Sequence, residues 1–129
     1  MADGLSATLA GNWLGMLGGT AYTAPAATYI KLHTGAPGAA GTSNASSVTT
    51  RPAVTWGTPS AGSVAESNTP AWTSWAGTNG EVVTDISIWD SSTAGTFLLS
   101  AALSASKTVN TGDTLQLTTL SVAFTPIAA

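Results

Sequence analysis

The segment from Tyr29 to Trp56 reads YIKLHTGAPGAAGTSNASSVTTRPAVTW, and it is the part of the sequence that is most informative about the fold. Its two ends, residues 29–34 and 48–56, alternate between apolar or β-branched side chains and polar ones, as half-buried strands do. Between them, three glycines and a proline at positions 35–41 exclude a helix and disfavour the interior of a strand. The stretch therefore predicts the first strand pair of a β-sandwich, with a long loop extending from one end.

The composition fits one globular domain with unusually few charges. The chain has 129 residues, the size of a single domain, and no cysteine that could form a disulfide or a thiolate metal site. Charged residues make up 7% of the sequence, against a typical value of about 25%. A surface built from Ser, Thr, Asn and backbone suits a protein held in a large assembly. The alternative is an ordinary β-domain of the secreted type.

Charge and hydropathy argue against two classes of partner. The net charge is −3 with only three Lys and Arg residues, whereas binding a phosphate backbone requires a dense basic patch. No apolar run approaches the roughly 20 residues that span a bilayer. The N-terminus also lacks the basic region of a secretory signal. We therefore expect neither nucleic acid nor a membrane as a partner.

Short strands separated by turns follow along the chain, and no helical segment separates them. This pattern predicts an all-β fold, an antiparallel β-sandwich that is immunoglobulin-like or jelly-roll-like. Asn79-Gly80 suits a type I′ hairpin turn. The remaining predicted strands cover residues 63–67, 71–75, 81–90, 96–103 and 114–124.

The segment 81–90 is the clearest strand of the sequence. Its alternation places Val83 on the face opposite Ile86. Glu81 and Asp85 would lie about 13 Å apart along such a strand. A single calcium site would therefore not include both carboxylates.

Residues 3–17 are predicted to form a helix that begins at Asp3 as N-cap and ends at Gly18-Gly19. Its glycines make it marginal alone, so it must pack on something. It either covers one end of the sandwich or docks on a partner subunit. The predicted division is therefore an N-terminal helix and arm over residues 1–19 and a β-sandwich domain over residues 20–129. One apolar stripe of the helix contains Leu5, Leu9, Trp13, Met16 and Leu17.

The sequence contains no recognisable catalytic or ligand-binding constellation. It lacks a nucleophile elbow, a zinc-protease motif and a phosphate-binding loop. With one histidine and no cysteine, a nucleophile–base pair would have to use His33. A histidine within an alternating strand is more often structural. We therefore assign no catalytic residue, no metal ligand and no cofactor.

Arg51 and two of the five tryptophans are candidates for specific contacts. Arg51 is predicted to bind Asp85, Asp90 or loop carbonyls. Trp72 and Trp75 differ by an odd number, so in a regular strand at least one of them leaves the core. The tryptophans are expected to serve the core or an interface, and a platform for sugar rings is the alternative.

Several motifs occur in a characteristic order, and the sequence that contains them resembles a family of small virion proteins of tailed bacteriophages, especially those infecting actinobacteria. The family often has an acid where this chain has Ala36. Its members are described as head decoration proteins and as minor tail or tail-fibre proteins, and it has no catalytic motif. The motifs are MADGLS at 1–6, YIKLHTGAPG at 29–38, RPAVTW at 51–56, ISIWD at 86–90, GTFL at 95–98 and LSASKTV at 103–109.

The resemblance implies a non-enzymatic virion structural protein, first of all a capsid decoration protein on the outside of the head. Its expected partners are itself, as a trimer, and the major capsid protein. The main alternative is a minor tail or fibre-associated protein that contacts other tail proteins and host sugars. A free carbohydrate-binding module is the third. The candidate interface residues are Leu5, Leu9, Trp13, Leu17, Gly35, Pro37, Gly38, Gly41, Arg51, Trp72 and Trp75.

Overall fold

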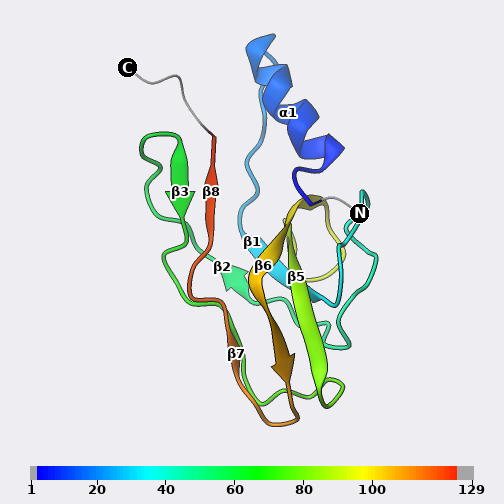
Figure 1. Ribbon diagram of the computed structural model, residues 1–129. Coiled ribbons are helices and arrows are strands. Elements are labelled where there is room, and N and C mark those ends of the chain that lie inside the picture. Colours follow the sequence, from blue (N-terminus) through cyan, green and yellow to red (C-terminus); the bar gives the residue numbers. More distant parts are fainter. Residues whose placement is uncertain (1–2, 125–129) are drawn as a thin grey trace.

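Within the described residues, the chain forms one helix, a four-stranded sheet and two short two-stranded ribbons (Figure 1). The computed structural model describes residues 3–124. Its elements are α1 (Ala7–Leu17), β1 (Thr28–His33), β2 (Ala53–Val54), β3 (Ser63–Ala65), β4 (Ala71–Trp72), β5 (Glu81–Trp89), β6 (Phe97–Val109), β7 (Leu115–Gln116) and β8 (Ser121–Ala123).

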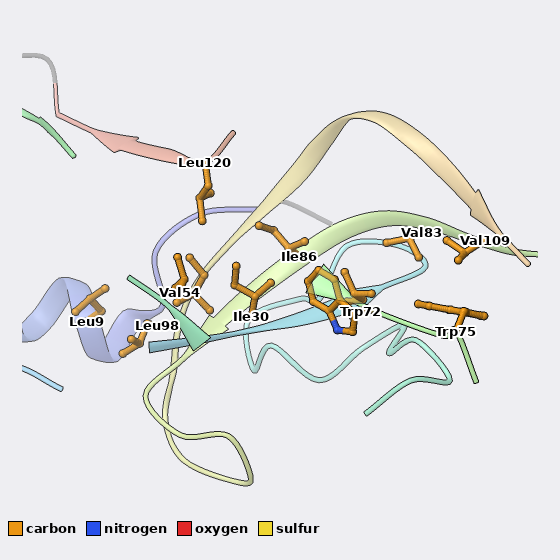
Figure 2. Packing of buried hydrophobic residues seen from close by; sticks show 12 residues of the cluster. Leu9, Ile30, Val54, Trp72, Trp75, Val83, Ile86, Leu98, Val109 and Leu120 are labelled. Atoms are coloured by element: carbon orange, nitrogen blue, oxygen red, sulfur yellow. The ribbon is translucent and has the colours of Figure 1, made fainter. Parts of the chain in front are cut away.

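The four-stranded sheet has the order β2-β1-β5-β6, and all neighbouring strands are antiparallel. The ribbons pair β3 with β8 and β4 with β7, also antiparallel. Ile30 and Ile86 of the sheet share one buried cluster with Trp72 of β4 and with Leu120, which precedes β8. Figure 2 shows the apolar side chains gathered around Ile30 and Ile86. The predicted all-β, sandwich-like fold with an N-terminal helix is confirmed.

Strand β5 is buried on both faces, which makes it the centre of the molecule. Every residue from Asp85 to Trp89 is buried. Ile86 and Ile88 belong to the core cluster. The opposite face carries Ser87, which bonds to His33 of β1. A strand covered on one face only would alternate in burial, so a second layer of chain must lie over this outer face.

Val83 lies in the core with Ile86, so the prediction that placed these residues on opposite faces is wrong. The pairing of β5 with β6 shifts register between Val83 and Asp85. Between these two pairs β5 advances by two residues and β6 by five, so the extra residues lie on β6. Such an irregularity bends the strand pair and increases its local twist, so the two faces of a regular strand are not continued across it. The alternation of the sequence does not reveal a bulge, because it assumes a regular strand.

The helix begins later than predicted, because Ser6 and not Asp3 is its N-cap. The hydroxyl of Ser6 accepts a hydrogen bond from the amide of Leu9 at 3.1 Å. Asp3 instead accepts a bond from the Ser100 hydroxyl at 3.0 Å. The amide of Ser6 donates to the carbonyl of Leu98 at 2.7 Å, and the amide of Ser100 donates to that of Gly4 at 2.8 Å. Residues 3–6 therefore extend the sheet beside the start of β6.

The type I′ turn occurs at Ala61-Gly62 and not at Asn79-Gly80. Ala61 and Gly62 both have positive φ, of 49° and 79°. Ser60 and Ser63 exchange two backbone hydrogen bonds around them, as in a two-residue hairpin. At the predicted position only Gly80 has a positive φ. The dipeptide Asn79-Gly80 therefore marks a turn correctly, but the turn is not of type I′.

Candidate interaction surfaces

The loop Gly35–Ser47, here called the covering loop, is held by hydrogen bonds within its own chain. The amide of Thr34 donates to the Asn44 carbonyl at 2.8 Å, and that of Ser46 donates to the Leu32 carbonyl at 3.0 Å. At its far end the Glu81 carboxylate accepts bonds from the Ser46 hydroxyl and from the amide of Ser47. The chain itself therefore supplies partners for these groups, whereas contacts of the loop with neighbouring subunits stay a prediction.

The predicted interface residues of the covering loop point inward. Pro37, Gly38 and Gly41 are buried, and Gly35 is half-buried. Gly41 has a φ of 71°, and a Cβ at this position would lie 2.5 Å from the ring of Phe97. These residues pack the loop onto the outer face of the sheet. The exposed residues of the loop are its small and polar ones, at positions 39, 40, 42–45 and 47.

His33 is the centre of a closed hydrogen-bond network beneath the covering loop. Its Nδ1 lies 2.9 Å from the Ser43 carbonyl, and its Nε2 lies 2.7 Å from the hydroxyl of Ser87. The indole of Trp89 donates to the same hydroxyl at 2.8 Å. Burial lowers the pKa of His33. Both ring nitrogens are occupied and the side chain is fully buried, so His33 serves the structure, as predicted.

Arg51 fixes the loop that joins β5 to β6. Its guanidinium lies 4.4 Å from the centre of the Trp89 ring. One of its nitrogens donates to the carbonyls of Ser91 at 3.1 Å and Ala94 at 2.8 Å. The predicted pairing with loop carbonyls is confirmed, and both of these bonds go to carbonyls instead of to Asp85 or Asp90. The planar cation therefore joins the segment just before β2 to a turn about 40 residues later.

Trp72 and Trp75 are both buried, with 5% and 2% of their surface exposed. The prediction that one of them leaves the core is therefore wrong. Strand β4 ends at Trp72, and Ser74 has a φ of 50°, so the odd spacing does not span a regular strand. The two indoles donate to the carbonyls of Thr50 and Thr78, respectively. Trp89 is buried as well, whereas Trp13 and Trp56 are half-buried.

The helix buries only part of its predicted stripe. Leu9 is buried, and Trp13 is half-buried against the core. Leu5 of the arm is 42% exposed, and Leu17 at the end of the helix is 86% exposed. Leu14, outside the stripe, is also exposed. The helix therefore adds one side chain to the core and presents apolar residues to the surroundings.

An apolar groove of about 630 Å³ lies between α1 and the β3–β8 ribbon. Figure 1 shows these two elements on either side of the segment that leads into β1. Trp13 and Phe124 stand edge to face with ring centres 5.1 Å apart. The groove is lined by Leu9, Trp13, Tyr22, Trp56, Val122 and Phe124, among others.

A second cleft, of about 420 Å³, separates β6 from the segment 115–121. Strand β6 is the last strand in the order of the sheet, and its outer part from Leu103 onward is an edge. The pairing with β5 is irregular here, because Val83 pairs with Lys107 and Asp85 with Ala102. An irregular strand that carries a lysine is a poor template for a further strand.

The described residues provide no other chemical centre. Residues 3–124 hold no group of three or more His, Cys, Asp or Glu side chains that could bind a metal. No helix in the same range is long and apolar enough to cross a membrane. The predicted interface residues thus fall into two groups. Leu5, Trp13 and Leu17 lie at the surface or at the groove, whereas Trp72, Trp75 and most of those in the covering loop are buried.

Comparison with known proteins identifies the family. No curated protein matches the chain. The family described as Podophage GP4 fiber I protein gp80 matches residues 4–125. The match supports the predicted resemblance to phage virion proteins, whereas the actinobacterial host stays a prediction. Because it covers almost the whole chain, this protein belongs to the Podophage GP4 fiber I protein gp80 family and is a phage virion protein.

Proposed function

We propose that this chain is a non-enzymatic structural component of a phage fibre, on the tail side of the virion. The observation that carries this proposal is the family match over residues 4–125, because the family is one of fibre proteins. The sequence alone favoured decoration of the head. The match to a fibre family supports a location on the tail at least as well as decoration of the head, and we therefore propose the tail first.

The packing of polar groups is consistent with a structural role. In residues 3–124, no buried side-chain nitrogen or oxygen lacks a hydrogen-bond partner. His33, the one histidine of the chain, has both ring nitrogens engaged. A general base needs a free nitrogen within reach of a substrate proton. These groups hold loops in place, which is what a passive building block of a particle requires.

Copy number and location in purified virions test this proposal. The intensity of this band is compared with that of the major capsid protein on a gel, and gold-labelled antibodies locate the chain by electron microscopy. A fibre component is expected in few copies, with label at the tail. Label over the head together with near-stoichiometric amounts would overturn the proposal.

Head decoration is the second candidate, and the absence of coiled-coil or repeated segments within residues 1–129 favours it, because such segments often give a fibre protein its length. In that case the partners are the major capsid protein and further copies of the chain, whereas a fibre component would contact other tail proteins. Contacts with host sugars through tryptophan would have to use Trp13 or Trp56, because Trp72, Trp75 and Trp89 are buried.

A further inference from the structure

We propose that the apolar groove binds the exposed end of α1 from a second copy of this chain. The docking surface consists of the groove and of Leu14, Met16 and Leu17 on α1. This inference does not depend on whether the protein sits on the head or on the tail. It names the surface through which the chain associates with itself.

The docking surface carries no charge. The sequence has no Asp, Glu, Lys or Arg from Gly4 to Ile30, which includes α1 and the segment that leads into β1. The groove is also lined by uncharged residues. The net charge of −3 therefore lies elsewhere in the chain. Two copies can meet at this surface without bringing like charges together, although they repel each other as whole molecules.

The helix needs more burial than its own chain provides. It has 11 residues, two of them the glycines Gly11 and Gly15, and Leu9 is its one buried residue. A helix of this length is marginal in water without packing. Leu14, Met16 and Leu17 expose 66%, 51% and 86% of their surface. A second copy would supply the missing contacts.

The groove and the exposed apolar residues of α1 lie at the same end of the molecule. Trp13 contributes to one wall of the groove, and Leu14 and Leu17 follow it on the same helix. Phe124, which is 57% exposed, meets Trp13 edge to face at the opposite wall. Aromatic rings at the centre of an apolar surface are typical anchors of protein interfaces. A surface that contains both a groove and protruding apolar side chains can be complementary to the same surface of a second copy.

The test compares two lysine variants of the full-length chain by sedimentation velocity over a hundredfold range of concentration. The variant Leu14→Lys/Leu17→Lys changes exposed residues near the end of a helix, where lysine is favourable for the fold. Val82→Lys is the matched control, because Val82 is also exposed but lies on β5. We expect wild type and Val82→Lys to associate, and the double variant to associate more than about 100-fold more weakly.

Mixed single-cysteine variants identify the contact directly, because the natural chain has no cysteine. Leu17→Cys and Pro59→Cys are mixed under oxidising conditions, and a disulfide between the two chains is expected. Val82→Cys mixed with Pro59→Cys should give none. The proposal is overturned if wild type stays monomeric or if the double lysine variant associates like wild type. It is also overturned if removal of residues 125–129 is needed before the chain associates, since the chain's own end would then cover the groove.

Discussion

At the scale of single residues, the network around His33 defines one tautomer. The Ser43 carbonyl can only accept a hydrogen bond, so Nδ1 of His33 must carry the proton. Nε2 then accepts from the Ser87 hydroxyl, which in turn accepts from the indole of Trp89. Every donor has an acceptor while the imidazole is neutral. A second proton on Nε2 would break this order, because the hydroxyl proton of Ser87 would then lose Nε2 as its acceptor.

The first prediction concerns acid stability. Burial lowers the pKa of His33, partly countered by the Ser43 carbonyl and Asp85 and reinforced by Lys31 and Arg51. The unfolded chain therefore binds a proton more readily than the folded one. The free energy of unfolding should be constant above the unfolded pKa of about 6.5. It should fall below it by at most about 1.4 kcal/mol per pH unit, until the folded pKa is passed.

Urea unfolding between pH 8 and pH 5 measures this dependence. A His33→Gln variant should lose most of it, because the chain has no other histidine. An unchanged pH profile in this variant would show that the dependence arises from the carboxylates. A wild-type profile that is flat throughout would contradict the neutral buried imidazole.

The second prediction concerns Arg51. Lysine keeps the charge but loses the planar group that lies on Trp89 and donates to two carbonyls. Arg51→Lys should therefore lower the free energy of unfolding by about 1–2 kcal/mol. The exposed Lys107→Arg is the control for a change of cation without such contacts. Equal urea midpoints for Arg51→Lys and wild type would refute this role.

At the scale of elements, the covering loop depends on a close approach of backbone to a ring. Gly41 and Gly112 have φ angles of 71° and 89°, so both disfavour a side chain. A Cβ at Gly41 would collide with Phe97, whereas one at Gly112 would meet nothing within 4 Å. The pair therefore separates the cost of backbone conformation from the cost of the collision.

The third prediction follows from this pair. Gly112→Ala should cost about 1–2 kcal/mol, for the left-handed backbone alone. Gly41→Ala should cost about 1–3 kcal/mol more, because the collision overpacks the contact with Phe97. Thermal and urea unfolding of the two variants provide the comparison. If both variants lose the same stability, the covering loop moves away from Phe97 at little cost.

Strand positions could be predicted from the sequence better than their lengths and faces. The alternation at 29–34 corresponds to β1, and 81–90 corresponds to β5. Residues 48–56 form only the two residues of β2, and the expected final strand is divided into β7 and β8. Alternation indicates where a strand can form, but pairing with neighbours determines how far it extends. The bulge of β6 opposite Val83 and the turn at Ser74 depend on such neighbours and left no sequence signal.

The candidate interface could be predicted only in part, because contacts between distant segments also determine which apolar residues are exposed. Apolar spacing correctly marked the helix as the element in need of a partner. It could not distinguish buried Leu9 from exposed Leu17. Which part of the helix packs on the sheet depends on how residues 3–6 pair with β6. The groove escaped prediction entirely, since its walls come from segments more than 100 residues apart. A local sequence pattern does not predict contacts between segments so far apart in the chain.

At the scale of the whole molecule, the N-terminal arm joins the helix to the sheet. The arm pairs with the start of β6 through Gly4 and Ser6, and Leu9 enters the common core. From the sequence, the helix and arm were expected to form a part separate from the sandwich over residues 20–129, and that division stays a prediction. The contacts favour an arm that protects the edge of the sheet.

The fourth prediction separates these two views by deleting residues 1–19. Leu9→Ala alone should cost about 2–5 kcal/mol, because it empties a buried position. The deletion should cost more, since it also removes the backbone bonds to Leu98 and Ser100. Hydrogen exchange gives a local measure: the Ser100 amide donates to the arm and should lose its protection. The Ile86 amide, in the central strand between β1 and β6, should keep it in any chain that still folds. If Ser100 stays protected and stability is unchanged after deletion, the arm is a separate part whose contacts matter only in the virion.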